Sequence, residues 1–234
     1  MRPLLLVTRP ADEAARTQHA AEEAGFDALV APLMCIESLA WTYPAGDFDA
    51  LLFTSPQGPN HAAAQFAQIA HLPVHAVGQA TAKAAAACGF SVVAIGDRDA
   101  SGILAQAAAS GCRTMLHLSG EAVAAMVVPA GLSIARVPVY RAVLADALPE
   151  PAHLALAAQT AFATLLYSAR TAQRFGTLVD SAGLDRSVLR IIAISQAAAA
   201  AVGPGWASVA CASHPTTDAL LAAAQGLWQR CHHG

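Results

Sequence analysis

Hydroxyl side chains recur in this sequence at the points where short apolar runs end. The run 51–53, for example, is followed by Thr54 and Ser55. The full set of these strand-end hydroxyls is Thr8, Thr54, Ser55, Ser119, Ser168 and Ser195. Each precedes a predicted helix, whose free N–H groups attract anions. They could therefore bind carboxylate or phosphate groups, although capping of the helix would select the same residue types at the same place.

A second chemical candidate is Tyr140, which precedes Arg141 in an extended-looking segment. A phenol that faces a cleft could donate a proton to a reacting group. The alternative is an aromatic side chain that packs across a strand pair. Other chemistry has less support, because the Gly-x-Ser-x-Gly nucleophile motif is absent and the acids nearest to a predicted strand end are Asp97, Asp99 and Glu121.

The elements that position these side chains alternate between strand and helix. Continuously apolar runs such as 50–53 and 74–77 predict parallel strands that helices cover on both faces. Alanine-rich stretches such as 59–70 and 79–88 predict the helices. Short connections imply right-handed crossovers and a doubly wound sheet. No G-x-G-x-x-G motif follows the first strand and no G-x-x-x-x-G-K-[ST] motif occurs, so a nucleotide site is poorly supported.

The chain also repeats itself. The succession of apolar run, hydroxyl and alanine-rich stretch that begins at 51 returns at 165. The chain start, 4–8, has a partner at 115–119. This internal duplication predicts an α/β protein of two similar flavodoxin-like lobes with parallel sheets, and two lobes make a cleft.

Two extended-looking segments, 34–39 and 137–143, interrupt the alternation. They could pass side by side as a two-stranded linker, in which case one lobe is discontinuous in sequence. The resulting boundaries are 1–33 plus 144–234 for lobe one, 39–137 for lobe two, and 34–38 with 138–143 for the linker strands.

Composition argues against several classes of protein. The 234 residues are 56% hydrophobic and 12% charged, which suits a packed core, and the net charge of −3 creates no basic field for nucleic acid. Apolar stretches end well before the ~18 residues of a membrane span, and the chain start lacks a signal-peptide layout, so we expect a cytoplasmic protein. We expect the five cysteines, none in C-x-x-C spacing, to be buried free thiols, and we expect no metal.

Several short motifs, in matching order over nearly the whole chain, resemble the uroporphyrinogen-III synthase family. They are V-T-R-P at 7–10, L-L-F-T-S-P at 51–56, A-V-G-x-x-T-A at 76–82, V-P-V-Y-R at 137–141, L-L-Y-S at 165–168, A-I-S at 193–195 and H-P-T-T-D-A-L-L at 214–221. No single motif is diagnostic. Their order and spacing, together with the internal repeat, make the resemblance specific.

The resemblance implies enzymes with two α/β lobes joined by a two-stranded linker, which act as monomers without a metal or an organic cofactor. Such enzymes close hydroxymethylbilane, a linear tetrapyrrole with eight carboxylates, to uroporphyrinogen III. The reaction inverts the last pyrrole ring and releases water. Loss of the hydroxyl leaves an electron-poor azafulvene that a pyrrole attacks, so the protein needs to help water leave and to hold the chain folded, and it needs no nucleophile of its own.

The resemblance also implies roles for particular residues. Tyr140 matches the family's tyrosine proposed to assist loss of the hydroxyl, and Arg9 falls in a motif near the lobe opening. With the strand-end hydroxyls, the expected substrate-binding residues are Arg9, Thr54, Ser55, Thr81, Ser168 and Ser195. The helix after Ser195 departs from the family pattern, because Gln196, Ala197 and Ala198 replace the usual proline and threonines. Backbone N–H groups would have to bind the substrate there.

Two other interpretations remain open from the sequence. The chain could be a non-catalytic two-lobed binder or regulator of small molecules that kept the fold. It could also be a different small-molecule enzyme on a flavodoxin-like scaffold, since a fold alone does not determine a function.

Overall fold

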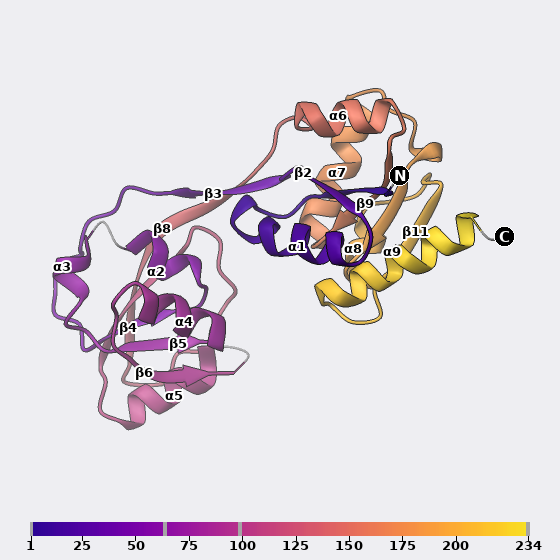
Figure 1. Cartoon of the computed structure of the whole chain (residues 1–234). Helices are drawn as coiled ribbons and strands as arrows, with labels where there is room; N and C mark the ends of the chain where they lie inside the picture. Colours follow the sequence, from indigo (N-terminus) through magenta and orange to yellow (C-terminus); the bar gives the residue numbers. More distant parts are fainter. Residues whose placement is uncertain (1, 63–64, 98–99, 233–234) are drawn as a thin grey trace. The chain divides into compact units, whose positions relative to one another are not determined.

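The computed structural model describes residues 2–62, 65–97 and 100–232 (Figure 1). The contacts divide the chain into two compact units, which are Met1–Cys35 with Val143–Gly234 (unit 1) and Ile36–Ala142 (unit 2). The two breaks between these units, at 35/36 and 142/143, fall inside the segments expected as linker strands, 34–38 and 138–143. Each unit contains its own sheet, so each is described by itself.

The sheet of unit 1 contains five parallel strands. In spatial order they are β11 (Ser208–Cys211), β10 (Arg190–Ala193), β9 (Ala161–Leu166), β1 (Leu4–Val7) and β2 (Asp27–Val30). Counted along the chain from the opposite edge, this order is 2-1-3-4-5, the flavodoxin-like arrangement. The helices of this unit are α1 (Ala11–Glu23), α6 (Glu150–Ala157), α7 (Ala169–Ser181), α8 (Gln196–Ala201) and α9 (Thr217–His232).

Helices cover both faces of this sheet, which explains why its strands are continuously apolar. Leu6 and Leu166 pack into a cluster with residues of α6, α7 and α8, such as Phe175. Their chain neighbours Leu5 and Leu165 pack on the other face with residues of α1 and α9. Successive side chains of a strand point to opposite faces, so each face needs its own apolar set.

The sheet of unit 2 has the order β3 (Met34–Ser38), β8 (Ser133–Leu144), β7 (Thr114–Gly120), β4 (Ala50–Phe53), β5 (Val74–Val77) and β6 (Val92–Gly96). The strands from β8 to β6 are parallel. Counted along the chain from β4, their order is 3-2-1-4-5. This differs from the flavodoxin-like order expected for both lobes. The difference arises because β7 and β8 come last along the chain in unit 2, whereas β1 and β2, which have the corresponding places in the sheet of unit 1, come first.

The helices of unit 2 are α2 (Gln57–Ala62), α3 (Phe66–Ile69), α4 (Gln79–Ala87) and α5 (Ala100–Ala109). The expected single helix over 59–70 is wrong, because α2 and α3 are separate short helices and α2 begins two residues before Pro59. A proline in the first turn is tolerated there, since its missing N–H would have no helical partner.

The strands β3 and β8 carry the chain from one unit to the other. The N–H of Leu39 donates to the Val139 carbonyl at 2.9 Å, and the N–H of Ala145 donates to the Leu33 carbonyl at 3.0 Å. Residue numbers rise on one strand as they fall on the other, so the pair is antiparallel. An ion pair also joins these strands, in which Arg141 Nη2 and Nε donate to the same oxygen, Glu37 Oε2, at 2.8 and 3.0 Å.

The cysteines are more exposed than the composition led us to expect. None of the five cysteine thiols is buried, because Cys35 and Cys231 are exposed and the other three are half-buried, so the expectation of buried thiols is wrong. Cys35 lies on the edge strand β3 and Cys231 in the last turn of α9, where solvent reaches the side chain. Within the part of the chain that the structure describes, no helix is long and apolar enough to cross a membrane.

Candidate functional site

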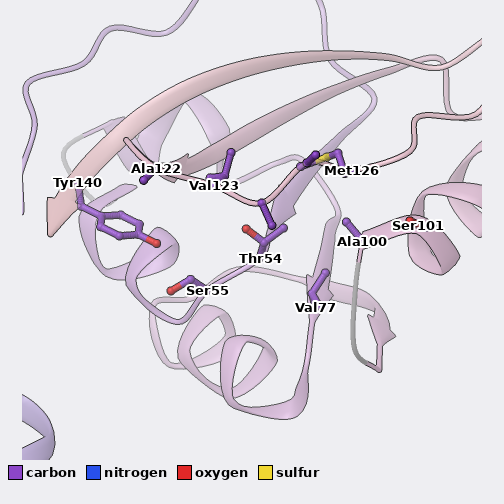
Figure 2. Close-up of a pocket in the computed structure, with 11 residues that line it drawn as sticks. Thr54, Ser55, Val77, Ala100, Ser101, Ala122, Val123, Met126 and Tyr140 are labelled. Carbon is purple, nitrogen blue, oxygen red and sulfur yellow. The ribbon is translucent and has the colours of Figure 1, made fainter. Parts of the chain in front are cut away.

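A pocket of about 290 Å³ lies in unit 2 where β4 and β5 end (Figure 2). Ligands of parallel α/β sheets bind beyond the carboxyl ends of the strands, and the pocket has this position. Its polar lining comes from Thr54, Ser55, Ser101 and Tyr140. The structure therefore brings together three of the residues that the sequence suggested, namely the hydroxyls after β4 and the tyrosine of β8.

The hydroxyls reach the pocket because β4 is completely buried and stops at its edge. All four residues of β4 are buried, and Thr54 and Ser55 are the first half-buried residues after it. The chain then turns closely over the sheet into α2. A Cβ at Gly58 would lie 2.7 Å from the Phe53 ring and 2.9 Å from the Leu118 carbonyl, so this approach requires glycine.

A bulge in β8 places Tyr140 at the pocket. Ser119 of β7 pairs with Pro138, but the next residue, Gly120, pairs with Tyr140, so Val139 is an extra residue. Val139 and Tyr140 both pack on the same apolar cluster, whereas neighbours in a regular strand point to opposite faces. The bulge therefore turns the phenol toward the pocket.

Two neighbours hold the Tyr140 ring. A Cβ at Gly120 would lie 2.9 Å from two ring carbons, so the ring lies directly against the backbone of β7. The His61 ring of α2 has its centroid 5.6 Å from the Tyr140 centroid, with 31° between the ring planes. Tyr140 is half-buried, and Figure 2 shows its hydroxyl directed toward the side of the pocket that carries Ser55 and Thr54. The packing role considered for this aromatic side chain thus coexists with a hydroxyl that faces the pocket.

The remaining wall of the pocket is apolar and follows β7. Most of it is the segment 122–126, with the sequence Ala-Val-Ala-Ala-Met, and Val77 and Ala100 complete the apolar lining. Arg136 holds the chain just before this segment, because its Nε donates to Ser119 Oγ at 3.1 Å and its Nη2 to the Gly120 carbonyl at 2.8 Å. This wall was not expected from the sequence. Its signal is an apolar stretch that matches neither the strand nor the helix pattern.

A buried histidine that was not expected from the sequence, His117, lies behind the pocket. His117 Nε2 is 3.1 Å from Thr54 Oγ1, and the side chain is fully buried in β7. Burial, reinforced by the nearby Arg136 cation, lowers the pKa of His117 to about 4. The imidazole is therefore neutral at physiological pH. Its signal in the sequence is one histidine inside the apolar run 115–118.

The remaining expected residue of unit 2, Thr81, is not among the residues that line this pocket. Thr81 lies in α4 and is 2% exposed, with its side chain among the buried residues of that helix. Its expected contact with the substrate stays a prediction.

Unit 1 contains the other expected residues, and there the serines act as helix caps. Ser168 Oγ accepts the Thr171 N–H at 3.1 Å at the start of α7. Ser195 Oγ accepts the Ala198 N–H at 3.3 Å at the start of α8. The capping role weighed in the sequence analysis is therefore present at both serines, and it does not exclude a further contact to a ligand.

Arg9 lies at the carboxyl end of β1 in unit 1. Its guanidinium carbon is 4.8 Å from the centroid of the Tyr167 ring, and its Nη1 donates to Thr17 Oγ1 at 3.3 Å. With Arg16 and Thr217 it lines a pocket of about 290 Å³. Burial raises the pKa of the Tyr167 phenol to about 12, although Thr17 and Arg9 act in the opposite direction.

The fold and the site together define a parallel α/β protein with a hydroxyl-lined pocket and a phenol at the carboxyl ends of its strands. Residues 15–222 match the family described as uroporphyrinogen-III synthase HemD. The chain therefore belongs to the uroporphyrinogen-III synthase family, whose members are cyclising hydro-lyases of haem biosynthesis. Its activity is the closure of hydroxymethylbilane to uroporphyrinogen III with loss of water, and the non-catalytic alternative is not favoured.

Solved structures similar to this chain include enzymes of the same name. The uroporphyrinogen-III synthetase of Helicobacter pylori 26695 has a TM-score of 0.64 at 16% identity, and the match covers 97% of this chain and 100% of that one. It shares the fold. A mutant uroporphyrinogen III synthase of the extremely thermophilic bacterium Thermus thermophilus has a TM-score of 0.49 at 17% identity, with 99% and 100% coverage. No curated protein matches the chain in sequence.

Proposed function

We propose that the pocket of unit 2 is where hydroxymethylbilane loses its hydroxyl group, with Tyr140 as the proton donor. The phenol O–H protonates the departing hydroxyl, the C–O bond breaks, and water leaves. The pyrrole nitrogen supplies the electron pair, which yields a protonated azafulvene. A pyrrole carbon then attacks it, and the proton that this carbon releases restores the phenol. The observation that carries this proposal is the phenol of Tyr140 directed, with Thr54 and Ser55, into one pocket.

The lining of the pocket suits a substrate that is apolar in its rings and anionic at its edges. Thr54, Ser55 and Ser101 offer hydroxyl groups to a carboxylate, and the segment 122–126 offers an apolar surface to a pyrrole ring. General acid catalysis contributes typically 10²–10⁴-fold to a rate, which is the share we assign to Tyr140.

We assign further carboxylates of the substrate to unit 1. Arg9 can bind a carboxylate through its guanidinium group, and Ser168 and Ser195 lie at helix starts, where N–H groups favour anions. Thr81 lies near the start of α4, and we keep it as a member of the binding set through that helix start.

The architecture that we propose for the enzyme follows the sequence expectations. Two duplicated lobes, 1–33 plus 144–234 and 39–137, are joined by linker strands at 34–38 and 138–143. The antiparallel pairing of β3 with β8 supports this linker. We propose a monomer that acts in the cytoplasm, on a polyacidic tetrapyrrole and not on nucleic acid.

The test is an isomer assay on the purified protein. Hydroxymethylbilane closes spontaneously to the type I isomer, so the fraction of type III isomer reports catalysis. We expect mostly the type III isomer from the wild-type chain. Production of the type I isomer alone, at the rate seen without protein, would refute the proposed function.

A further inference from the structure

The buried histidine behind the pocket forms a row with two neighbours across the sheet of unit 2. Leu52 of β4 pairs with His117 of β7 on one side and with His75 of β5 on the other. Residues paired across parallel strands share a face of the sheet. Thr54 follows Leu52 by two residues, so it points to the same face, one step nearer the pocket. This step brings Thr54 Oγ1 to 3.1 Å from His117 Nε2.

The surroundings of His117 determine which of its ring nitrogens carries the proton. The ring is neutral, so only one nitrogen is protonated. Nδ1 is buried and has no hydrogen-bond partner within the described residues, whereas Nε2 is at hydrogen-bond distance from Thr54. An orphaned N–H in a protein interior is rarer than an under-satisfied acceptor. The proton therefore belongs on Nε2.

This tautomer gives the Thr54 hydroxyl a direction. A protonated Nε2 donates to Thr54 Oγ1, which acts as the acceptor. The Thr54 O–H is then left to donate, and Thr54 lines the pocket. With the opposite tautomer, Thr54 would donate to the histidine and present only lone pairs to a ligand.

We propose that His117 is a positioning residue that makes Thr54 a hydrogen-bond donor into the pocket, so that this wall selects a carboxylate or another anionic acceptor. The proposal rests on the proposed function only in naming a substrate carboxylate as the acceptor. The donor direction itself concerns the free protein. The repeat in the sequence aligns His117 with Leu6 of β1, so unit 1 has an apolar residue at the corresponding place.

The first experiment tests the tautomer without any substrate. The chain is labelled with ¹⁵N-histidine, and long-range ¹H–¹⁵N correlation spectra distinguish a protonated from a bare ring nitrogen. The His117 signals are assigned by their loss in His117→Gln. We expect a protonated Nε2 and a bare Nδ1 at pH 7. A protonated Nδ1, or a ring protonated on both nitrogens, would overturn the proposal.

The second experiment separates positioning from structure with a double-mutant cycle. Loss of one hydrogen bond of ordinary strength weakens a binding constant by about fivefold. We therefore expect KM to rise about fivefold in His117→Leu. In Thr54→Val, which removes the donor itself, we expect KM to rise about tenfold. In the Thr54→Val background, His117→Leu should leave KM unchanged, because no hydroxyl remains to be directed. An independent, multiplicative effect in the double variant would contradict the proposal.

Two matched variants complete the design. His75→Leu removes the other buried imidazole of the same row, which makes no contact with Thr54 in any hydrogen bond that the structure shows, so stability changes and KM does not. His117→Gln places an amide N–H near the position of Nε2 and should recover part of the lost affinity. Failure of the wild-type isomer assay would refute the proposed function, whereas the spectra would still decide the donor direction. If Leu and Gln variants are equally impaired, the positioning role is excluded.

Discussion

The ends of the central strands β4 and β9 use the same kind of residue in different ways. After β4 in unit 2, Thr54 and Ser55 line a pocket together with Tyr140. After β9 in unit 1, Ser168 accepts the Thr171 N–H and also lies 2.9 Å from the Thr171 hydroxyl, so it caps a 13-residue helix. A hydroxyl at a strand end can thus cap a helix, line a pocket or do both, and the elements packed around the strand end determine which contacts it makes.

The difference comes from what surrounds each strand end. After β4 the chain passes through Pro56 into the short helix α2, which contains Gly58, and the segment 122–126 adds an apolar wall to the pocket. The phenols differ too. Both residues are half-buried, but the Tyr140 hydroxyl lies at a pocket, whereas the Tyr167 hydroxyl of unit 1 is buried, which raises its pKa to about 12. We infer that the duplicated pattern supplies a scaffold to both units and a proton donor to unit 2.

Among the variants that compare the two units, removal of the Tyr140 hydroxyl should cause the largest loss of activity. We expect Tyr140→Phe to lower kcat by about 100-fold or more, because the departing hydroxyl loses its acid, while the melting temperature changes little. The matched control is Tyr43→Phe, which removes a phenol of unit 2 that packs on Phe48 and lines no part of the pocket. Unchanged turnover in Tyr140→Phe would remove Tyr140 from the mechanism.

Acid titration should reveal the buried imidazole that unit 2 has and unit 1 lacks at the aligned position, Leu6. The pKa of His117 is lowered from 6.5 to about 4, so between these values the unfolded chain binds a proton that the folded chain does not. Its contribution is complete above pH 6.5 and falls as pH decreases toward 4, by on the order of 3 kcal/mol in the free energy of unfolding.

Denaturant titrations of wild type and His117→Leu across pH 4–7 measure this contribution. Carboxylates affect both proteins alike, so the difference between the two slopes isolates His117. Equal slopes would show that His117 titrates normally in the folded protein.

Substitution of one crowded glycine in each unit separates a loss of activity caused by a displaced phenol from one caused by lower stability. A Cβ at Gly120 would lie 2.9 Å from the Tyr140 ring, and one at Gly176 in α7 would lie 3.0 Å from the Val202 carbonyl. Overpacking typically costs about 1–3 kcal/mol, so both Gly120→Ala and Gly176→Ala should be less stable. Only Gly120→Ala should displace the phenol and lower kcat, by about tenfold. A similar kcat loss in both variants would mean that crowding acts through general instability.

The smallest effects should come from the serines. Ser168→Ala loses a helix cap and should lower the free energy of unfolding by about 1 kcal/mol. Ser55→Ala should leave stability nearly unchanged, since Ser55 Oγ accepts only a 3.3 Å contact from the Gln57 N–H, and should raise KM a few-fold. Thermal melts and steady-state kinetics on both variants decide this. The reverse pattern would mean that the assignment of cap and lining residue is exchanged.

The sequence predicted those features of the fold that depend on composition and periodicity. The apolar run at 51–53 identified β4 as a buried strand. The irregular segments at 34–39 and 137–143 contain β3 and part of β8, and their role as a linker stays a prediction. It did not predict the 3-2-1-4-5 order of unit 2. The local pattern of a strand says that both faces are covered, but it contains nothing about which strand lies beside it.

Residue type in the sequence pointed to three residues that line the candidate pocket, but it gave no access to contacts that depend on strand register. Thr54, Ser55 and Tyr140 were found because their chemistry is visible in one dimension. His117 was missed because a single histidine in an apolar run gives no sign of facing Thr54, 63 positions away. Ser168 and Ser195 could not be separated from Ser55, because capping and ligand binding favour the same residue at the same place.

The extra residue in β8 has a consequence for protein engineering. Deletion of Val139 would restore a regular ladder and place Tyr140 directly after Pro138, so that by strand alternation its ring would take the buried place of Val139 in the apolar cluster and its hydroxyl would leave the pocket. Grafting the phenol onto another doubly wound scaffold would therefore require transfer of the insertion and of the glycine facing it, because the tyrosine alone would point the wrong way.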